Sequence, residues 1–185
     1  MDRDPVEITT LIVSPVHAYQ GRPADGPRAD PEPVTRSSVL VRAGDGLVGD
    51  RYCGHPAHRH AAVTVFAAES LDTVRDELGP GPAFAPATAR RNIVLRGADV
   101  DALAAPGRGG TGAVFTLDSG DGPVRFQAYR AAHPCGWMDV VLAPGAFRAL
   151  RGRGGVRCTP LDDGVLRLGP AELGILMPAA GARAG

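Results

Sequence analysis

The sequence predicts a mainly β domain of the α+β class, built as a barrel or a sandwich with two or three helices at its periphery. Three observations support this class. Short strand-like runs recur, about seven to nine in all, with turn signals about every 8 to 12 residues. Gly 25 and Pro 17 among 185 residues favour turns and short elements over long helices. Residues 71–78 form the clearest segment with apolar residues at helical spacing.

Length and charge limit the classes of function. A chain of 185 residues suggests one domain, and no internal repeat divides it, so we expect a single domain over 1–185. The formal net charge is zero, which provides neither the basic field that concentrates nucleic acid nor a polybasic membrane patch. We therefore expect no nucleic-acid partner and no membrane partner.

All twenty basic residues are arginine. Without a lysine, this chain cannot form the Schiff base that holds pyridoxal phosphate, so that chemistry is excluded. It also lacks the Gly-Lys-Ser/Thr ending of the phosphate-binding loop.

The first half of the chain predicts three strands, a loop and a helix. The three strands are expected over 6–13, 37–43 and 61–66. The tract 20–33 is rich in Pro, Gly and Asp and has no periodicity, so we expect a mobile surface loop there. The helical spacing over 71–78 predicts a helix, and Gly79 and Pro80 end it.

The second half predicts further strands and short helices. The strand-like runs fall within 90–97 and 113–131, the latter as two strands joined by a turn at 120–122, and in a closing hairpin plus a final strand within 154–176. Met138–Leu142 and Ala146–Leu150 predict one or two short helices, with Pro144 at a helix start. The last residues, 178–185, are expected to fray.

Two segments match the dinucleotide-binding pattern G-x-G-x-x-G. The first, 44–49, follows a predicted strand, but Gly54 and Pro56 prevent a helix from opening there. The second, 107–112, leads into a strand. Because a pyrophosphate needs the N-terminus of a helix after the loop, neither segment predicts a nicotinamide or flavin site.

A histidine-rich loop is open to two interpretations. Cys53, His55, His58 and His60 fall within eight residues and could bind zinc or copper. Their spacing is not that of paired structural zinc ligands, and no second ligand group is evident in the sequence. A polar loop that leads into a strand is the simpler interpretation.

The three cysteines and the N-terminus bear on the compartment. An odd number of cysteines does not suggest a disulfide framework, and the acidic first residues do not resemble a secretory signal. No apolar run approaches the roughly 18 residues of a membrane span. We therefore expect a reduced, cytoplasmic protein with free thiols.

Cys135 is the cysteine best placed for chemistry. It follows Pro134 and precedes Gly136, just before a predicted helix whose N-terminus favours thiolate. His133 and Arg130 are close in sequence and could favour thiolate further. Thiolate is the form that attacks, carries a persulfide sulfur or ligates a soft metal. From local chemistry alone, a small residue that fills a turn is an equal alternative.

A set of polar residues could hold an anion. Arg90, Arg91 and Arg96 flank a short apolar strand. Arginines in such an arrangement can bind phosphate or carboxylate bidentately, although they are more often solvated. Asn92 lies among them, and Asp50 with Arg51 ends an earlier strand region and could orient a ligand.

These stretches together resemble the MOSC domain, the family named for the C-terminal domain of molybdenum cofactor sulfurase. The resemblance covers most of residues 8–175, through "SPVHAYQGRP", "AGDGLVGDRYCGHPAHR", "RRNIVLRGADVDAL", "HPCGWMDVVLAPGAFRALRGRGGVRC" and "DDGVLRLGP". The long loop at 20–33 departs from a compact connection. The resemblance implies a stand-alone member with a β-barrel core.

The resemblance also implies a cleft in which one cysteine is a sulfur carrier or a molybdenum ligand, and that cysteine maps onto Cys135. Residues 90–92, Asp50 and Arg51 map onto stretches that resemble pocket walls. A sulfur carrier without pyridoxal phosphate would need a separate cysteine desulfurase as donor, and a small molecule or metal cofactor as acceptor. The alternatives are a protein that binds the molybdenum cofactor, with Cys135 as ligand, and a non-catalytic module for a small anionic ligand.

Overall fold

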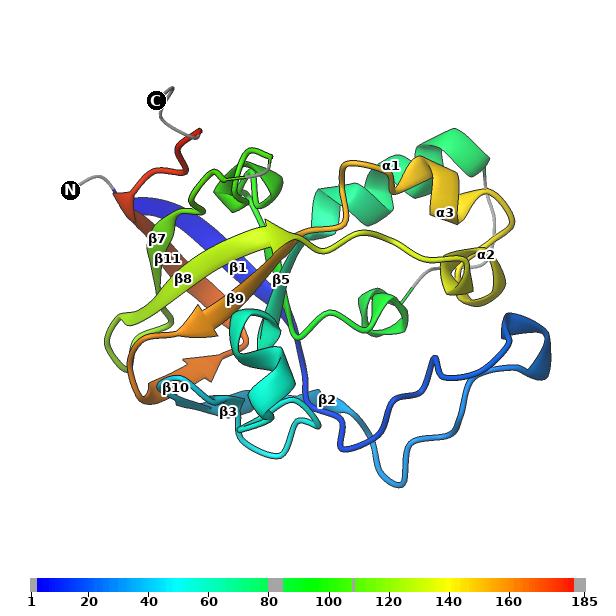
Figure 1. Ribbon diagram of the computed structural model, residues 1–185, viewed down its shortest axis with the longest axis horizontal. Coiled ribbons are helices and arrows are strands. Elements are labelled where there is room, and N and C mark those ends of the chain that lie inside the picture. The colour runs from blue at the N-terminus through cyan, green and yellow to red at the C-terminus, as the bar shows by residue number, and fades with distance from the viewer. Residues whose placement is uncertain (1–2, 80–84, 108, 182–185) are drawn as a thin grey trace.

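A closed β-barrel forms the centre of the molecule (Figure 1). The computed structural model describes residues 3–79, 85–107 and 109–181. The barrel strands are β1 (Arg3–Ile12), β5 (Val63–Ala67), β6 (Ile93–Arg96), β7 (Val114–Asp118), β8 (Val124–Ala131), β9 (Val156–Pro160) and β11 (Gly169–Met177). Their order is β11-β7-β8-β9-β5-β6-β1, and β1 pairs with β11 to close the ring. The predicted mainly β fold is thus confirmed, as a barrel.

The barrel is a mixed sheet in which β5 and β6 run parallel and the other neighbours run antiparallel. Parallel neighbours need a crossover connection, and α1 (Ala68–Leu78) supplies it here. In β1, Arg3 faces Gly174 of β11, while Leu11 faces Ile93 of β6. The two ends of β1 therefore lie at opposite ends of the barrel.

A second, three-stranded sheet joins β10 (Gly164–Arg167), β3 (Ser38–Arg42) and β4 (Gly46–Leu47), and the short β2 (Thr35–Arg36) extends β1. The predicted closing hairpin is wrong, because β9 pairs with β5 and β8 whereas β10 pairs with β3. The connection between them is held by side chains: Asp162 accepts from the Arg125 guanidinium and Asp163 from Arg42. The strand pattern alone does not specify β3 as the partner of β10.

Three α-helices occur in the described part of the chain: α1, α2 (Trp137–Val141) and α3 (Ala146–Ala149). They gather on one side of the barrel in Figure 1 and share a second apolar cluster that includes Trp137 and Leu71. The predicted helices are confirmed. Gly79 ends α1 in a left-handed backbone conformation with φ 79°, and Pro80 lies outside the described residues.

The described residues also form four short 3-10 helices: η1 (Pro23–Asp25), η2 (Pro56–Ala61), η3 (Pro86–Ala89) and η4 (Asp101–Leu103). Proline stands at the start of η1, η2 and η3, where its fixed φ suits a helix and its missing N–H costs no hydrogen bond.

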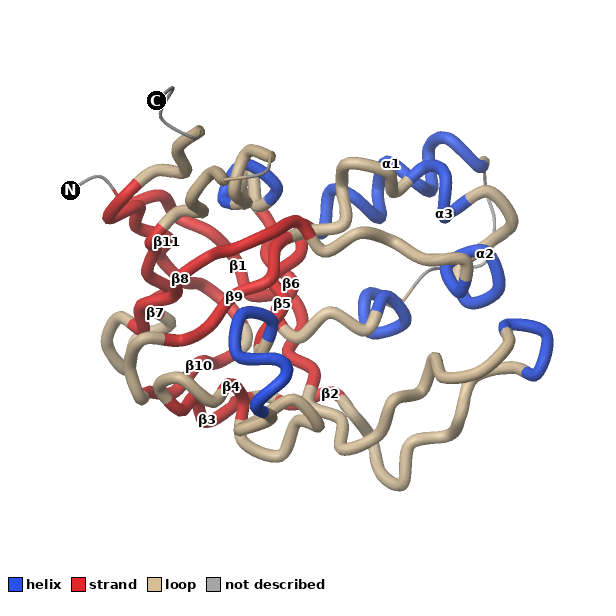
Figure 2. Tube along the Cα trace, viewed as in Figure 1, coloured by secondary structure: helices blue, strands red, loops and turns tan. Residues whose placement is uncertain are grey.

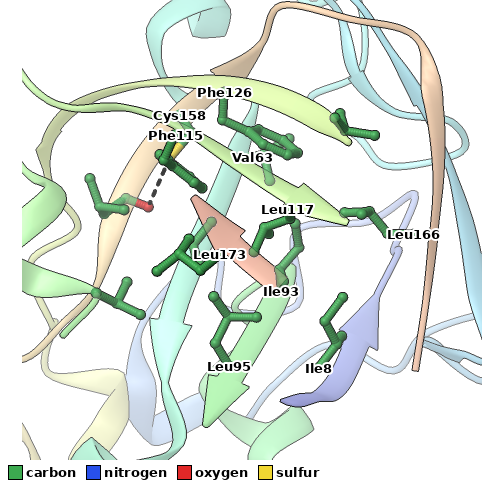
Figure 3. Close-up of a cluster of buried hydrophobic side chains, with 14 of the residues drawn as sticks. Ile8, Val63, Ile93, Leu95, Phe115, Leu117, Phe126, Cys158, Leu166 and Leu173 are labelled. Atoms are coloured by element: carbon green, nitrogen blue, oxygen red, sulfur yellow. Dashed lines mark hydrogen bonds between the residues drawn. The ribbon is translucent and has the colours of Figure 1, made fainter. Parts of the chain in front are cut away.

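Branched and aromatic side chains fill the barrel (Figure 3). Phe115 and Phe126 stack with their ring centroids 5.4 Å apart. Cys158 lies among these side chains with no exposed surface, and its Sγ atom is 4.0 Å from the carbonyl oxygen of Val156. Cys158 is therefore a buried core side chain of β9.

The loop between β1 and β2 extends away from the barrel on the side of α2 (Figure 2). Its helix η1 has no buried residue and lies close to α2. Within the loop, the Arg28 amide donates to the carbonyl oxygen of Ala18 at 2.8 Å. The expected loop at 20–33 is confirmed as irregular apart from η1, and its mobility stays a prediction.

The C-terminal segment is paired as far as Ala180, which exchanges two backbone hydrogen bonds of 2.9 Å with Thr111. This pairing overturns the expected fraying at that residue, while residues 182–185 lie outside the described part of the chain. Within the described residues, no helix has the length and apolar character needed to cross a bilayer.

Candidate functional site

A cavity of about 230 Å³ opens at the end of the barrel where β1 and β9 carry Ile12 and Arg157. Its walls come from β1 and the loop after it, from residues 50–64, from the turn before β6 and from the segment before α2. Four arginines line it: Arg51, Arg90, Arg91 and Arg157. The fold thus gathers the positive charge of three separate segments at one place, because Arg90 and Arg91 are neighbours in the chain.

Seven of the nine predicted site residues line this cavity: Asp50, Arg51, Arg90, Arg91, Asn92, His133 and Cys135. The other two, Arg96 and Arg130, lie elsewhere. Arg96 ends β6 and pairs with Asp72 of α1 at 2.8 Å. Because a strand advances about 3.3 Å per residue, the four residues from Asn92 carry Arg96 roughly 13 Å away. Arg130 is exposed on β8 and borders a different hollow.

Cys135 is exposed and lies on the cavity wall. Its carbonyl oxygen accepts the Met138 amide at 2.9 Å, which starts the turn into α2. With only five residues, α2 has a small macrodipole, so the expected support of thiolate by this helix is weak. The guanidinium of Arg91 is a second source of positive charge, because the Cys135 charge is one of the influences that raise the pKa of Arg91.

The other two cysteines are less accessible to reagents and less easily ionised. Cys158 is fully buried in the barrel, and burial raises the pKa of its thiol. Cys53 is half-buried beside the histidine-rich turn, where burial, and then the charges of Asp45 and Asp50, raise its pKa. Cys135 is thus the one exposed thiol among the three.

Arg91 ties the cysteine-bearing segment to β6. One of its terminal nitrogens donates to the carbonyl oxygens of Ala132 at 3.1 Å and His133 at 3.3 Å. Burial and the charge of Arg157 lower the pKa of Arg91 to about 10, so its guanidinium stays cationic at neutral pH. The His133 side chain is exposed on the cavity wall.

Two glycines bring β9 against the same segment. The Ala132 amide donates to the carbonyl oxygen of Gly155 at 2.8 Å. A Cβ atom on Gly154 would lie 1.9 Å from the Ala132 oxygen, so only glycine allows this approach. The Gly155 amide in turn donates to Asp101 at 2.8 Å. The backbone before Cys135 is therefore fixed from both sides.

Asp50 and Asn92 are buried and use their polar atoms inside the protein. Asp50 accepts the Ser14 amide, the Tyr52 amide and the Asn92 side-chain amide at 3.1–3.2 Å. Asn92 also donates to the carbonyl oxygen of Ile12 and accepts from Thr64. Both residues line the cavity, but these contacts connect β1, β5 and β6.

Arg51 and Arg157 have unused donors. Arg51 donates to the carbonyl oxygen of Val16 and to the Tyr52 hydroxyl, and its buried Nε has no partner. The half-buried Arg157 side chain makes no hydrogen bond or ion pair with any described residue. Burial, followed by the charge of Arg130, lowers the pKa of Arg157. Unpaired guanidinium donors on a cavity wall can receive an anion from solution.

Arg90 is already paired, with a residue that the sequence did not indicate. Its terminal nitrogens bind both carboxylate oxygens of Asp30, at 2.5 and 2.9 Å, and one of them also donates to the Ser14 hydroxyl at 2.8 Å. Arg90 is the one non-glycine residue with positive φ (55°) among those described. Asp30 lies in the aperiodic loop, so no local pattern distinguished it from other loop acids.

Aromatic side chains complete the wall. Tyr19 stacks on Trp137 with ring centroids 5.3 Å apart, and its hydroxyl donates to the Thr88 carbonyl oxygen. Burial raises the pKa of Tyr19 to about 12. Burial also lowers the pKa values of His17 and His58, which favours the neutral form of both imidazoles.

The remaining sequence motifs have ordinary structural roles. Residues 44–49 contain β4 and have positive φ at Gly44, Gly46 and Gly49, and no α-helix opens directly after them. The second glycine motif includes Arg108, which lies outside the described residues. Among the side chains that the structure describes, no three of the His, Cys, Asp or Glu type are grouped to hold a metal ion.

Comparison with known proteins identifies a family by sequence and a shared fold by structure. The sequence model of the MOSC domain matches residues 49–171. No curated protein matches the chain. The YuaD protein of Bacillus subtilis superposes with a TM-score of 0.68 at 14% identity, over 93% of this chain and 96% of its own.

Two further solved structures share the fold. YiiM from Geobacillus stearothermophilus has a TM-score of 0.59 at 16% identity, over 92% of this chain and 75% of its own. YiiM from Escherichia coli has a TM-score of 0.50 at 17% identity, over 94% and 70%.

Proposed function

The chain belongs to the MOSC domain family, and from this starting point we propose that it is a cysteine-dependent sulfur carrier. In this proposal Cys135 holds a persulfide sulfur and passes it to an anionic acceptor, which binds among the arginines of the cavity. The acceptor is a small molecule or a metal cofactor.

The observation that carries the proposal is the exposure of Cys135 on a wall that also presents Arg91, Arg157 and Arg51. A carrier thiol must be reached first by a donor protein and then by an acceptor, so it has to lie at the surface and beside a binding site. Guanidinium groups bind phosphate or carboxylate on the acceptor and also favour the thiolate form of a nearby cysteine.

The chemistry balances without an added oxidant. The Cys135 thiolate attacks the terminal sulfur of a persulfide on the donor, a new S–S bond forms on Cys135, and the donor S–S bond breaks with the donor thiolate leaving. A nucleophile on the acceptor then attacks the outer sulfur of Cys135, and Cys135 leaves as thiolate. Because the chain has no lysine for pyridoxal phosphate, a separate cysteine desulfurase must be the donor.

Mass spectrometry tests the proposal directly. Wild-type protein is incubated with a cysteine desulfurase and cysteine, and peptides are mapped without reduction. We expect a species roughly 32 Da heavier on the Cys135 peptide. Cys53→Ser is the matched control and should keep the modification, whereas Cys135→Ser should lose it. Absence of the heavier Cys135 peptide in wild type, with an active desulfurase, would contradict sulfur carriage.

The unpaired Arg51 Nε and the free Arg157 side chain favour a second candidate, the binding of a molybdenum cofactor. The donor set fits such a group in its chemistry: guanidinium suits the cofactor's phosphate, and the Cys135 thiol suits a soft metal. When bound, the cofactor would supply a redox-active metal. This chain would contribute phosphate binding through Arg51 and Arg157 and a thiol through Cys135.

Metal analysis distinguishes the two candidates. Protein expressed in a host that makes the cofactor should contain about one molybdenum per chain if the second candidate holds, and Cys135→Ala should lose that metal. Metal-free protein that still accepts sulfur on Cys135 supports carriage alone. Full biological activity in Cys135→Ser would instead favour a non-catalytic module that binds a small anion.

A further inference from the structure

We propose that Asp30 is an internal counter-ion of the cavity and makes it selective for doubly charged anionic groups. The inference rests on the proposed function in one respect, namely that the cavity binds an anion. It concerns the chemical class of that anion and the residue that selects it.

Arg90 and Ser14 together bind a carboxylate, and that carboxylate is the protein's own Asp30. Asp30 binds both terminal nitrogens of Arg90, and the Ser14 hydroxyl donates to Asp30 at 2.6 Å. The side chains are 11% exposed for Arg90 and 18% for Asp30, so the pair is largely shielded from solvent. A bidentate, charge-assisted pair of this kind is stronger than one at an open surface.

Asp30 reduces the positive charge that the cavity presents to an incoming anion. Four arginines and the carboxylate of Asp50 line the cavity. Asp30 is not itself a lining residue, but it binds Arg90, which is one. A singly charged anion offers Arg90 no more charge than Asp30 already provides, so it gains little by displacing it. A doubly charged group gains twice the Coulomb energy from Arg90, Arg91 and Arg157 together and can displace the carboxylate. Asp30 thus weakens the binding of monoanions more than the binding of dianions.

Displacement of Asp30 would also release the loop. Between Tyr19 and Asp30, the side chains are largely exposed. The hydrogen bonds of this segment are the two backbone bonds of η1, the Arg28–Ala18 backbone bond and an exposed Arg28–Gln20 bond, and η1 lies close to α2. Tyr19 anchors the start of this segment on Trp137, and Asp30 anchors its end. Binding of a dianion is therefore coupled to freedom of the segment 20–30.

The chain contains two reporters of this event. Trp137 is its single tryptophan and stacks on Tyr19, so its fluorescence responds at the loop anchor. Arg28 is exposed in the loop and is followed by Ala29, which makes the bond after Arg28 a site for trypsin. The bond after Arg22 precedes Pro23 and resists trypsin, so cleavage within 20–30 is specific for Arg28.

The experiment compares wild type with Asp30→Asn, which keeps the shape and removes the charge. Asp25→Asn is the matched control, because Asp25 is an exposed acid of the same loop without a side-chain hydrogen bond or ion pair to the described residues. Each protein is titrated with sulfate and with acetate at constant ionic strength. Binding is followed by Trp137 fluorescence and calorimetry, and loop opening by the rate of trypsin cleavage after Arg28.

Wild type and Asp25→Asn should bind sulfate in preference to acetate, and sulfate should accelerate cleavage after Arg28. Asp30→Asn should bind sulfate about tenfold more tightly, should also bind acetate, and should be cleaved quickly without any anion. Equal affinities in wild type and Asp30→Asn, or cleavage that sulfate does not change, would overturn the proposal. Failure of all three proteins to bind either anion would overturn it as well.

These readouts are independent of sulfur chemistry. A protein that passes this test but gains no sulfur on Cys135 retains the selection by Asp30 and loses the carrier function. A protein that gains sulfur on Cys135 but binds anions equally with and without Asp30 retains the carrier function and loses the selection.

Discussion

The Arg91 guanidinium donates a hydrogen bond to the carbonyl oxygen of Ala132 at 3.1 Å. Arg91 follows the strained Arg90 just before β6, whereas Ala132 lies three residues before Cys135, so this contact joins the arginine-lined wall of the cavity to the segment that carries the thiol. The position of Cys135 thus depends on a side chain 44 residues away in the sequence.

Arg91→Ala should therefore slow sulfur transfer to Cys135 more than it lowers the stability of the fold. Loss of two hydrogen bonds frees the segment before Cys135, and a misplaced thiol typically loses on the order of tenfold to a hundredfold in rate. The measurement is the rate of sulfur transfer to Cys135 from a desulfurase. Arg96→Ala is the control, because this arginine stands five residues further along the same segment, at the end of β6, and does not line the cavity. Equal rates for the two variants would show that Arg91 does not position the thiol.

The three thiols should react with iodoacetamide in a fixed order. Cys135 is exposed and should be alkylated first, Cys53 should follow slowly because burial raises its pKa, and Cys158 should be protected in the native protein. Peptide mapping over time gives the order, and alkylation in denaturant should remove the differences. Early modification of Cys158 would mean that the barrel opens readily.

Gly154→Ala should destabilise the junction between β9 and the cysteine segment. The new Cβ would meet backbone atoms, the Ala132 oxygen at 1.9 Å, which cannot move aside as a flexible side chain can. Overpacking of this kind costs about 1–3 kcal/mol, measurable as a lower urea midpoint. Gly181→Ala is the control, since a Cβ there meets nothing within 4 Å. A wild-type midpoint in Gly154→Ala would show that the backbone adjusts.

The Asp30–Arg90 pair should contribute to stability in a defined pH range. The hydrogen bond from Arg90 holds the pKa of Asp30 below its ordinary value. A carboxyl with a lowered folded pKa stabilises the protein above its unfolded pKa of about 3.9 and loses that effect as pH falls through the folded value. The difference in unfolding free energy between wild type and Asp30→Asn should therefore be constant from pH 5 to 8 and shrink below roughly pH 4. A constant difference down to pH 3 would exclude this linkage.

Local sequence patterns predicted the elements better than their partners. Apolar periodicity identified α1 because Leu71 and Val74 are buried on one helical face. The run at 164–167 was recognisable as a strand, but its partner β3 lies more than 120 residues earlier in the chain, and no local pattern specifies such a distant pairing.

Local sequence context also identified only some of the residues of the candidate site. Cys135, Arg90 and Arg91 were accessible to sequence reasoning because residue type and local context mark them. Arg96 was indistinguishable from its neighbours in the sequence, although β6 carries it to the far end of the strand. Asp30 and Arg157 gave no signal, since their importance arises only when loop, barrel and cysteine segment meet.

The pairing of Arg3 with Gly174 places the beginning of β1 beside the last strand. Ile12, at the other end of β1, lines the cavity. With a strand rise of about 3.3 Å per residue, Ile12 lies roughly 30 Å from Arg3. Both ends of the barrel's polypeptide therefore leave from the face remote from Cys135. A tag, a fluorescent protein or a second enzyme joined at either end leaves the thiol accessible, and joining the two ends by a short linker permits new termini within 20–30 without cutting a barrel strand.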